Sequence, residues 1–364
     1  MPLANWREGM QSAKADRTED PVIAAAAERK INLRSLEAAG FVHLFGIAPV
    51  LNALSAGRRD LVLSSEKSEA GVTPLQNLLT DQLNEEDQGQ EMDVKPEAQF
   101  SPWLFVQETS QRGAGRGSAR SASKARAARE IEELAEERGV RIARVDKGVL
   151  NSLCGSRPHQ GFVLRCGALD LEPLPQLPHP DEDASAPSLW LVLDEVVDPQ
   201  NFGALLRSAH FLGRGGAKVG VLVCSKNSAP PSPVVSAASS GALELCDVYS
   251  TSNLPRTLLA ASEAGFRVLG AAAEAPSQLT DADGQPVECL DLSDVASAAE
   301  DGRPTALVLG SEGDGLRNLV ARACTGFVRI PGGVGGGENS GTSAGVDSLN
   351  VSVTGGIMLW HLSN

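Results

Sequence analysis

The order of apolar and polar positions changes character along the chain. From Leu189 onward, apolar runs of strand length alternate with segments of helical periodicity. The predicted strands are 189–193, 219–224, 267–271, 305–309 and 326–330, and the predicted helices are 202–212, 234–239, 254–264, 316–321 and 351–359. This alternation predicts an open, mostly parallel sheet with helices on both faces. Ligands bind beyond the carboxyl ends of the strands in such sheets, so the residues after the strands are the candidates for chemistry.

A smaller α/β unit is predicted before this region. Its expected elements are an apolar segment at 42–46, helices at 48–56 and 127–138, and strands at 61–63 and 140–145, with Leu164 closing the unit. Residues 65–128 are first acidic and Gln-rich, then rich in Gly, Ser and Arg, with too few large apolar side chains to offset chain entropy. The expected domains are an N-terminal extension at 1–40, a smaller domain at 41–170 with a disordered insertion at about 65–126, a proline-rich linker at 171–188 and a larger domain at 189–364.

Composition narrows the class of protein. The 364 residues are 42% hydrophobic, enough for a substantial core, and no run of eighteen apolar residues predicts a membrane span. Six scattered cysteines without a C-x-x-C pair favour reduced thiols over a disulfide framework or a metal site. The net charge of −14 opposes nucleic-acid binding, but residues 112–129 carry six basic side chains and no acidic one.

The first candidate segment follows the strand at 189–193. Pro199 and Asn201 start a helix, and Gly203 permits a close approach of another backbone. Arg207 lies one turn further along, where it can face the strand-end crevice and bind a phosphate in a bidentate manner. A surface ion pair is the alternative interpretation of this arginine.

Two further segments follow the strands at 305–309 and 326–330. Gly310–Leu316 is a glycine-flanked acidic turn that presents Glu312. It matches neither the dinucleotide fingerprint nor the P-loop motif. A tight turn with a capping acid and no ligand is the alternative interpretation. The last segment begins at Ile330-Pro331 and resumes at Ser348-Leu349-Asn350, which suits a helix N-terminus. The glycine-rich stretch 333–346 between its halves is interpreted as a flexible insertion.

Taken together and in this order, the three segments resemble the three sequence motifs of the SpoU (TrmH) RNA ribose 2′-O-methyltransferases of the SPOUT superfamily. Residues 45–50 and 158–163 resemble the start and end of the family's N-terminal RNA-recognition domain. The closest subgroup by resemblance is the mitochondrial large-subunit rRNA guanosine 2′-O-methyltransferases. The sequence departs from the pattern at 333–346, which lengthens the third motif, and at Ala237, where a basic residue is expected.

The resemblance implies a C-terminal parallel-sheet SPOUT domain with a trefoil knot, a smaller N-terminal α/β RNA-recognition domain, a homodimer, and S-adenosylmethionine as cofactor. The implied cofactor-binding residues are Leu309, Gly310, Gly313, Ile330 and Leu349, the catalytic residues Arg207, Glu312 and Asn350, and the substrate-binding residues Asn201, Arg207 and Ser348, with no metal. Arg207 is expected to hold an RNA phosphate and stabilise the forming alkoxide, while Glu312 and Asn350 orient the ribose or the cofactor.

The implied reaction is methylation of a ribose 2′-hydroxyl, of guanosine, in the large-subunit rRNA of a mitochondrial or other bacterial-type ribosome. A mitochondrial location is expected although the first forty residues carry no clear transit peptide, and the cytoplasm or a plastid remains open. The Arg-rich end of the insertion is expected to bind RNA non-specifically. Two alternatives remain, a tRNA ribose methyltransferase and a non-catalytic RNA-binding factor in ribosome assembly, and cofactor binding separates the second from an enzyme.

Overall fold

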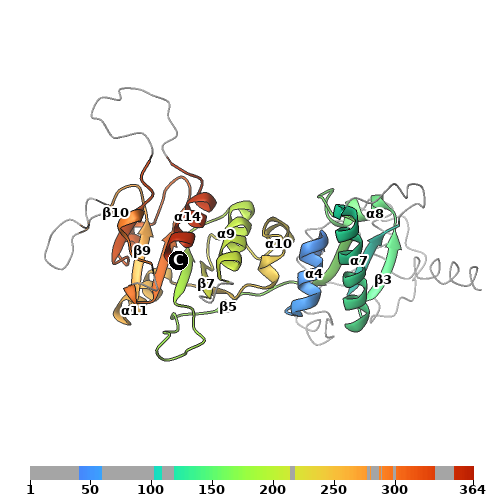
Figure 1. Cartoon of the computed structure of the whole chain (residues 1–364), viewed down its shortest axis with the longest axis horizontal. Helices are drawn as coiled ribbons and strands as arrows, with labels where there is room; N and C mark the ends of the chain where they lie inside the picture. The colour runs from blue at the N-terminus through green and yellow to red at the C-terminus, as the bar shows by residue number, and fades with distance from the viewer. Residues whose placement is uncertain are drawn as a thin grey trace, which may run out of the picture. The chain divides into compact units, whose positions relative to one another are not determined.

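The computed structural model of the chain describes residues 41–59, 102–108, 119–213, 218–276, 279, 287, 289–297, 301–332 and 348–364. They form two compact units, which divide after Leu169 (Figure 1). The expected extension at 1–40, the expected strand at 61–63 and the glycine-rich stretch 333–346 lie outside the described residues. No helix in the described part of the chain is both long and apolar enough to cross a membrane.

The first unit contains a four-stranded sheet in the order β1-β4-β2-β3. The strands are β1 (Phe41–Phe45), β2 (Trp103–Gln107), β3 (Arg141–Val145) and β4 (Phe162–Gly167), and the helices are α4 (Ile47–Ala56), α7 (Ala119–Glu137) and α8 (Lys147–Leu153). The pairs β1–β4 and β4–β2 are antiparallel, whereas β2–β3 is parallel. Helices α4 and α7 pack together, and their apolar stripes bury the same face of the sheet (Figure 1).

The prediction of disorder at about 65–126 is wrong for two parts of that range. Strand β2 lies inside the sheet, between β4 and β3, and its first four side chains are buried. Helix α7 begins at Ala119, eight residues before the predicted start at Ala127, so part of the Arg-rich stretch is helical. A run of four apolar residues between polar segments shows little periodicity, and the neighbours of β2 in the sheet are far away in sequence. The rest of the range lies outside the described residues.

The second unit contains an eight-stranded, all-parallel sheet in the order β10-β12-β9-β11-β6-β7-β8-β5. Its strands are β5 (Glu172–Pro173), β6 (Leu189–Leu193), β7 (Val219–Cys224), β8 (Val248–Thr251), β9 (Arg267–Ala271), β10 (Cys289–Asp291), β11 (Thr305–Leu309) and β12 (Gly326–Arg329). Its α-helices are α9 (Pro199–Leu212), α10 (Pro233–Ala238), α11 (Leu254–Glu263), α13 (Asn318–Ala321) and α14 (Val351–Ser363). The predicted parallel α/β class is confirmed, while the trefoil knot stays a prediction.

Side chains that alternate along the strands of the second unit build two apolar layers. Trp190, Val192, Ala306 and Val308 belong to one buried cluster together with residues of α11 and α13. Leu309 faces the opposite side, where α14 packs beside α9 and α9 packs on α10 (Figure 1). The sheet is therefore covered on both faces, and its functional residues must lie at an edge.

The expected linker at 171–188 contributes to the second unit. Strand β5 pairs in parallel with β8, and Leu177 is buried in the cluster under α11. The Trp190 Nε1–H donates to the carbonyl of Pro187 at 3.1 Å. The prolines of this stretch favoured the prediction of a linker over a strand. A strand of two residues at the edge of the sheet, however, needs few backbone donors and tolerates proline.

His43 on β1 is buried and should make the first unit sensitive to acid. Burial, followed by the nearby positive charge of Arg165, lowers the pKa of His43 from 6.5 to about 3. A depressed pKa means that the unfolded chain binds a proton below pH 6.5 that the folded unit cannot accept. The contribution of neutral His43 to the unfolding free energy is thus fully present above pH 6.5 and is lost progressively as the pH is lowered from there towards 3.

We therefore expect the unfolding free energy of the first unit to drop by about 1.4 kcal/mol more between pH 7.5 and 5.5 in the natural chain than in His43→Phe. Hydrogen exchange of the β1 and β4 amides at the two pH values measures this difference. The same pH dependence in both proteins would contradict the assignment to His43.

Candidate active site

The segments that follow β6 and β11 meet at the carboxyl edge of the sheet. Leu193 and Leu309, the last residues of the two strands, are direct partners in the parallel pairing. The pairing continues one residue further, because the Asp194 N–H donates to the Leu309 carbonyl at 2.8 Å. The loop that leads into α9 and the turn 310–316 therefore begin side by side.

Three predicted site residues form one hydrogen-bonded cluster at this edge. The Asn201 Nδ2 donates to Glu312 Oε1 at 3.0 Å, and the Asn350 Nδ2 donates to Asn201 Oδ1 at 3.0 Å and also to Glu312 Oε1. The Val351 N–H points to the same carboxylate oxygen, at 3.4 Å. Residues from α9, from the turn after β11 and from the start of α14 are thus brought together, as their positions after strands predict.

Asn350 has a second role that makes the cluster rigid. Its Oδ1 accepts from the backbone N–H groups of Ser352, at 2.9 Å, and of Val353, at 3.4 Å, and so caps α14. The side chain is therefore held by the helix end through one atom and by Glu312 and Asn201 through the other. The cap also fixes the direction in which the amide donates.

The turn that presents Glu312 is closed by its own backbone. Ser311 and Gly315 exchange two hydrogen bonds, at 3.0 and 3.1 Å, and Gly315 has a φ of +65°. A Cβ on Gly310 would lie 2.2 Å from the Gly315 carbonyl oxygen, a distance that the backbone cannot relieve without opening the turn. Glycine is thus required at 310 for packing and favoured at 315 for conformation.

A first cavity of about 240 Å³ opens where β9, β11 and β12 end. It is lined by Ala271, Ala272, Ala273, Leu309, Gly310, Ser311, Glu312, Gly315, Arg329, Ile330, Ser348, Leu349, Val351, Thr354 and Met358. Four of the five expected cofactor-binding residues are among them, and Gly313 is not. No local pattern singled out Ala271–Ala273, although they lie at the carboxyl end of a predicted strand, where ligands of parallel sheets bind.

A second cavity, of about 350 Å³, lies next to the first. It is lined by Glu195, Val196, Val197, Asp198, Asn201, Ser311, Glu312, Gly313, Asp314 and Val351. Ser311, Glu312 and Val351 line both cavities, so Glu312 stands at their boundary. Gly313 thus belongs to the second cavity rather than the first.

Arg207 is not brought together with this cluster within one chain. It is exposed on α9 and lines neither cavity. Phe211 follows it by four residues on the helix, so the two side chains share one exposed face. No group of three or more His, Cys, Asp or Glu among the described residues is arranged to hold a metal ion.

Close packing of α14 against α9 and β11 depends on Gly355. A Cβ there would lie 2.3 Å from Leu205 Cδ2 and 2.6 Å from Leu309 Cδ1, and Leu309 lines the first cavity. At the next residue, Gly356, a Cβ would meet only Ser208 Oγ, at 3.6 Å, which is ordinary contact. The two glycines form a matched pair for a test.

We expect Gly355→Ala to lower the unfolding free energy by about 1–3 kcal/mol through overpacking and to narrow the first cavity. Gly356→Ala should be neutral or stabilising by up to about 1 kcal/mol, because alanine favours helix over glycine. Urea unfolding of both variants measures the difference. Equal stability of the two would contradict the packing argument.

Comparison with known proteins agrees with this arrangement. The profile of the SpoU rRNA methylase family matches residues 188–360, and that of an RNA 2′-O ribose methyltransferase substrate-binding domain matches residues 119–171. The crystal structure of an AdoMet-bound rRNA methyltransferase from Sinorhizobium meliloti has the same fold, with a TM-score of 0.56 and 15% identity over 94% of each chain.

Two relatives are similar in sequence. Human "rRNA methyltransferase 1, mitochondrial" is 36% identical over 63% of this chain, and the match spans 61% of the human protein's length. The "23S rRNA (guanosine-2′-O-)-methyltransferase RlmB" of Xanthomonas campestris is 34% identical over 64% of this chain and 81% of its own. On these matches and on the arrangement of the three segments, the chain belongs to the SpoU rRNA methylase family.

Proposed function

We propose that this protein transfers a methyl group from S-adenosylmethionine to a ribose 2′-hydroxyl, of guanosine, in large-subunit rRNA. The observation that carries the proposal is the pair of adjoining cavities with Glu312 between them, held by Asn201 and Asn350. A donor in one cavity and a ribose in the other would meet at this carboxylate. The names of the human and Xanthomonas relatives support rRNA, and the latter supports guanosine.

The first cavity fits S-adenosylmethionine. Leu309, Ile330 and Met358 offer an apolar surface to a flat ring, while Ala271–Ala273 and Gly310 leave backbone polar groups accessible to the ligand. A larger side chain at 310 would collide with the Gly315 carbonyl, so the cavity depends on this glycine. The bound cofactor supplies an electrophilic methyl group on a sulfonium.

Glu312 is suited to orient a hydroxyl of the target ribose. Every hydrogen bond to its carboxylate within the described residues falls on Oε1, from Asn201, Asn350 and Val351. The remaining oxygen, Oε2, is available to accept from a ribose hydroxyl. Binding would hold the hydroxyl in the direction that the reaction requires. The entropic cost of orienting it is then met on binding and no longer adds to the activation barrier, which is how this cluster would accelerate transfer.

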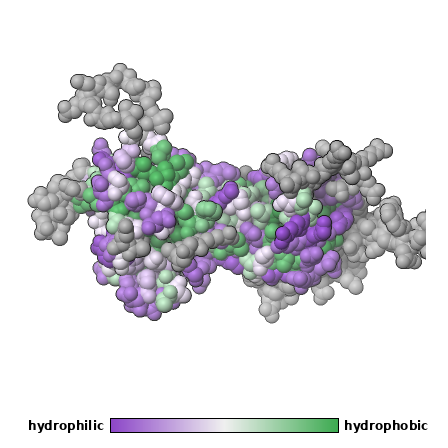
Figure 2. Space-filling view, in the orientation of Figure 1, coloured by the Kyte–Doolittle hydropathy of each residue, from purple (hydrophilic) through white to green (hydrophobic). Residues whose placement is uncertain are grey.

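We further propose a homodimer that covers one apolar face of the second unit. Phe211 on α9 and Val353, Ile357 and Trp360 on α14 are exposed, and the last three follow one another at helical spacing. Hydrophobic surface gathers over α14 in Figure 2. Arg207 shares the exposed face of Phe211, so a second copy on this surface would place Arg207 at the subunit boundary, where we assign it to an RNA phosphate and the forming alkoxide.

The first unit is proposed to bind the RNA. The substrate-binding profile covers all of α7 and the strands β3 and β4 that follow it. Lys124, Arg126 and Arg129 lie on α7 and can supply the phosphate contacts that the overall negative charge does not. A mitochondrial location is proposed on the name of the human relative.

We expect the purified chain to bind S-adenosylmethionine in isothermal titration and to transfer tritium from its methyl group to unmodified large-subunit rRNA as alkali-resistant ribose label. Arg207→Ala should abolish transfer, at least 100-fold, while cofactor affinity and folding stay unchanged, because Arg207 lines neither cavity. Label only in tRNA would favour the tRNA enzyme. Absence of cofactor binding would favour the non-catalytic RNA-binding factor.

Trp360→Glu should weaken the homodimer more than tenfold, since it places a charge in an apolar interface. Leu319→Glu is the matched control, because Leu319 is about as exposed as Trp360 but lies on α13, across the sheet. Sedimentation velocity over a range of concentrations measures both. Dissociation by Leu319→Glu but not by Trp360→Glu would place the interface elsewhere.

A further inference from the structure

We propose that Asp194 and Arg317 are positioning residues, whose ion pair fixes the Ser311–Leu316 turn against the loop after β6 and thereby sets where Glu312 stands between the two cavities. We call these two residues the Asp194–Arg317 clamp. The inference rests on the proposed function for its catalytic consequence. That the ion pair fixes the turn can be tested by hydrogen exchange, without a measurement of activity.

A single carboxylate holds both the side chain and the backbone of Arg317. The Asp194 side chain is fully buried, and its Oδ1 accepts from Arg317 Nε at 2.8 Å and lies 2.6 Å from Nη2. Its Oδ2 accepts from the Arg317 backbone N–H at 3.1 Å. Two guanidinium nitrogens on Oδ1 and the backbone N–H on Oδ2 together define direction as well as distance. The position of residue 317 is thus fixed relative to the end of β6.

The same guanidinium reaches the wall of the second cavity. Arg317 Nη1 lies 3.4 Å from Glu195 Oε1, which also accepts from Asn227 Nδ2 at 3.0 Å. Glu195 has a φ of +59°, an uncommon conformation for a residue with a side chain. Both Glu195 and the 311–314 turn line the second cavity. Arg317 therefore connects these two parts of the lining.

Besides the clamp, the turn is held by the hydrogen bonds that Glu312 accepts from Asn201, Asn350 and Val351 and by the packing of Leu316 against the buried cluster that contains Val308. It leaves the sheet after Leu309, is closed by the Ser311–Gly315 bonds, and ends at the clamp. Glu312 sits at its tip and is exposed. If the Arg317 end were released, the turn could pivot about Leu309, and Glu312 would lose its alignment with Asn201 and Asn350. A displacement of about 1 Å in such a group can cost about 100-fold in rate.

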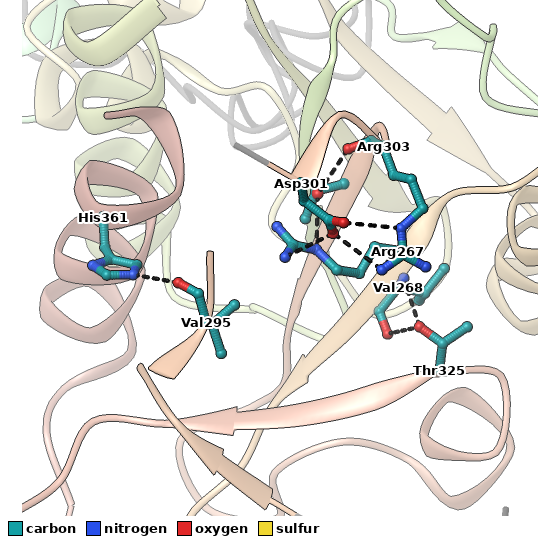
Figure 3. A network of polar contacts seen from close by, with 8 residues as sticks. Arg267, Val268, Val295, Asp301, Arg303, Thr325 and His361 are labelled. Atoms are coloured by element: carbon teal, nitrogen blue, oxygen red, sulfur yellow. Dashed lines mark hydrogen bonds and ion pairs between the residues drawn. The ribbon is translucent and has the colours of Figure 1, made fainter. Parts of the chain in front are cut away.

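An ion pair at the amino ends of the strands provides a matched control for the clamp. Arg267, the first residue of β9, pairs with Asp301 at 2.9 Å (Figure 3). It also donates to the Oγ1 of Thr305, the first residue of β11, at 3.2 Å. Both partners of this pair are mostly buried, and Asp301 also binds Arg303. The Arg267–Asp301 pair is thus similar in kind to the clamp but remote from the cavities.

The test compares two neutral double variants of the full chain, Asp194→Asn with Arg317→Gln, and Arg267→Gln with Asp301→Asn. Changing both partners avoids leaving a buried charge unpaired. We measure thermal stability, cofactor affinity, kcat and KM for rRNA, and hydrogen exchange of peptides that cover 310–317. Arg317→Lys, which keeps the charge but loses the planar fork, serves as a milder variant if the clamp double variant does not fold.

We expect the clamp double variant to lower kcat by at least 30-fold and to show faster exchange at Ser311 and Gly315. Cofactor affinity should also fall, because Ser311, Glu312 and Gly315 of the turn line the first cavity. Arg317→Lys should lower kcat about fivefold. The control double variant should lose similar thermal stability but keep kcat within twofold and leave exchange in the turn unchanged.

Unchanged exchange in the turn of the clamp variant would overturn the inference, as would equal losses of kcat in the two double variants. If the natural chain neither binds the cofactor nor transfers methyl groups, the proposed function fails. In that case faster exchange at Ser311 and Gly315, confined to the clamp variants, still establishes that Asp194 and Arg317 position the turn.

Discussion

The parallel pairing of β6 with β11 is the constraint on which the site depends. These are the two middle strands of the sheet, and their last residues, Leu193 and Leu309, are direct partners. The segments that follow the two strands therefore begin at the same edge of the sheet. These segments are the loop into α9, which follows β6, and the turn with Glu312, which follows β11. A shift of register by one residue would separate Asn201 from Glu312 and would also move the side chains of one strand to the opposite apolar layer.

Helix packing then brings the third segment to this edge. Gly355 lets α14 approach Leu205 and Leu309, and a Cβ on Gly203 would lie 2.5 Å from the Cβ of Ala238 on α10. Such close approaches are possible only because these glycines lack a Cβ, and they place the N-terminus of α14 beside the turn. Asn350 is both the cap of that helix and a donor to Glu312, so the helix end and the site are stabilised by the same side chain.

Charge is divided unevenly between the parts of the proposed RNA surface. The second cavity carries Glu195, Asp198, Glu312 and Asp314, and no lysine or arginine lines it. In the proposed function, phosphate groups would therefore bind outside this cavity, on Arg207 and on the basic side chains of α7, while the cavity would accept a nucleoside. This separation reconciles a net charge of −14 with nucleic-acid binding, since phosphate contacts need local rather than overall positive charge.

The sequence by itself determined the elements with strong local patterns and the residues that follow them. Strands β6, β7, β9, β11 and β12 and the long helices were predicted because their periodicity is local. Asn201, Glu312 and Asn350 were identified as site residues through the resemblance of their segments to the SpoU motifs. Tertiary structure alone decided that β2 completes the first sheet, that β5, β8 and β10 extend the second, and that Asp194 binds Arg317. These features rest on partners far apart in sequence, 123 residues in the case of Asp194 and Arg317. Their pairing energy appears only once the intervening chain has folded, and no local pattern records it.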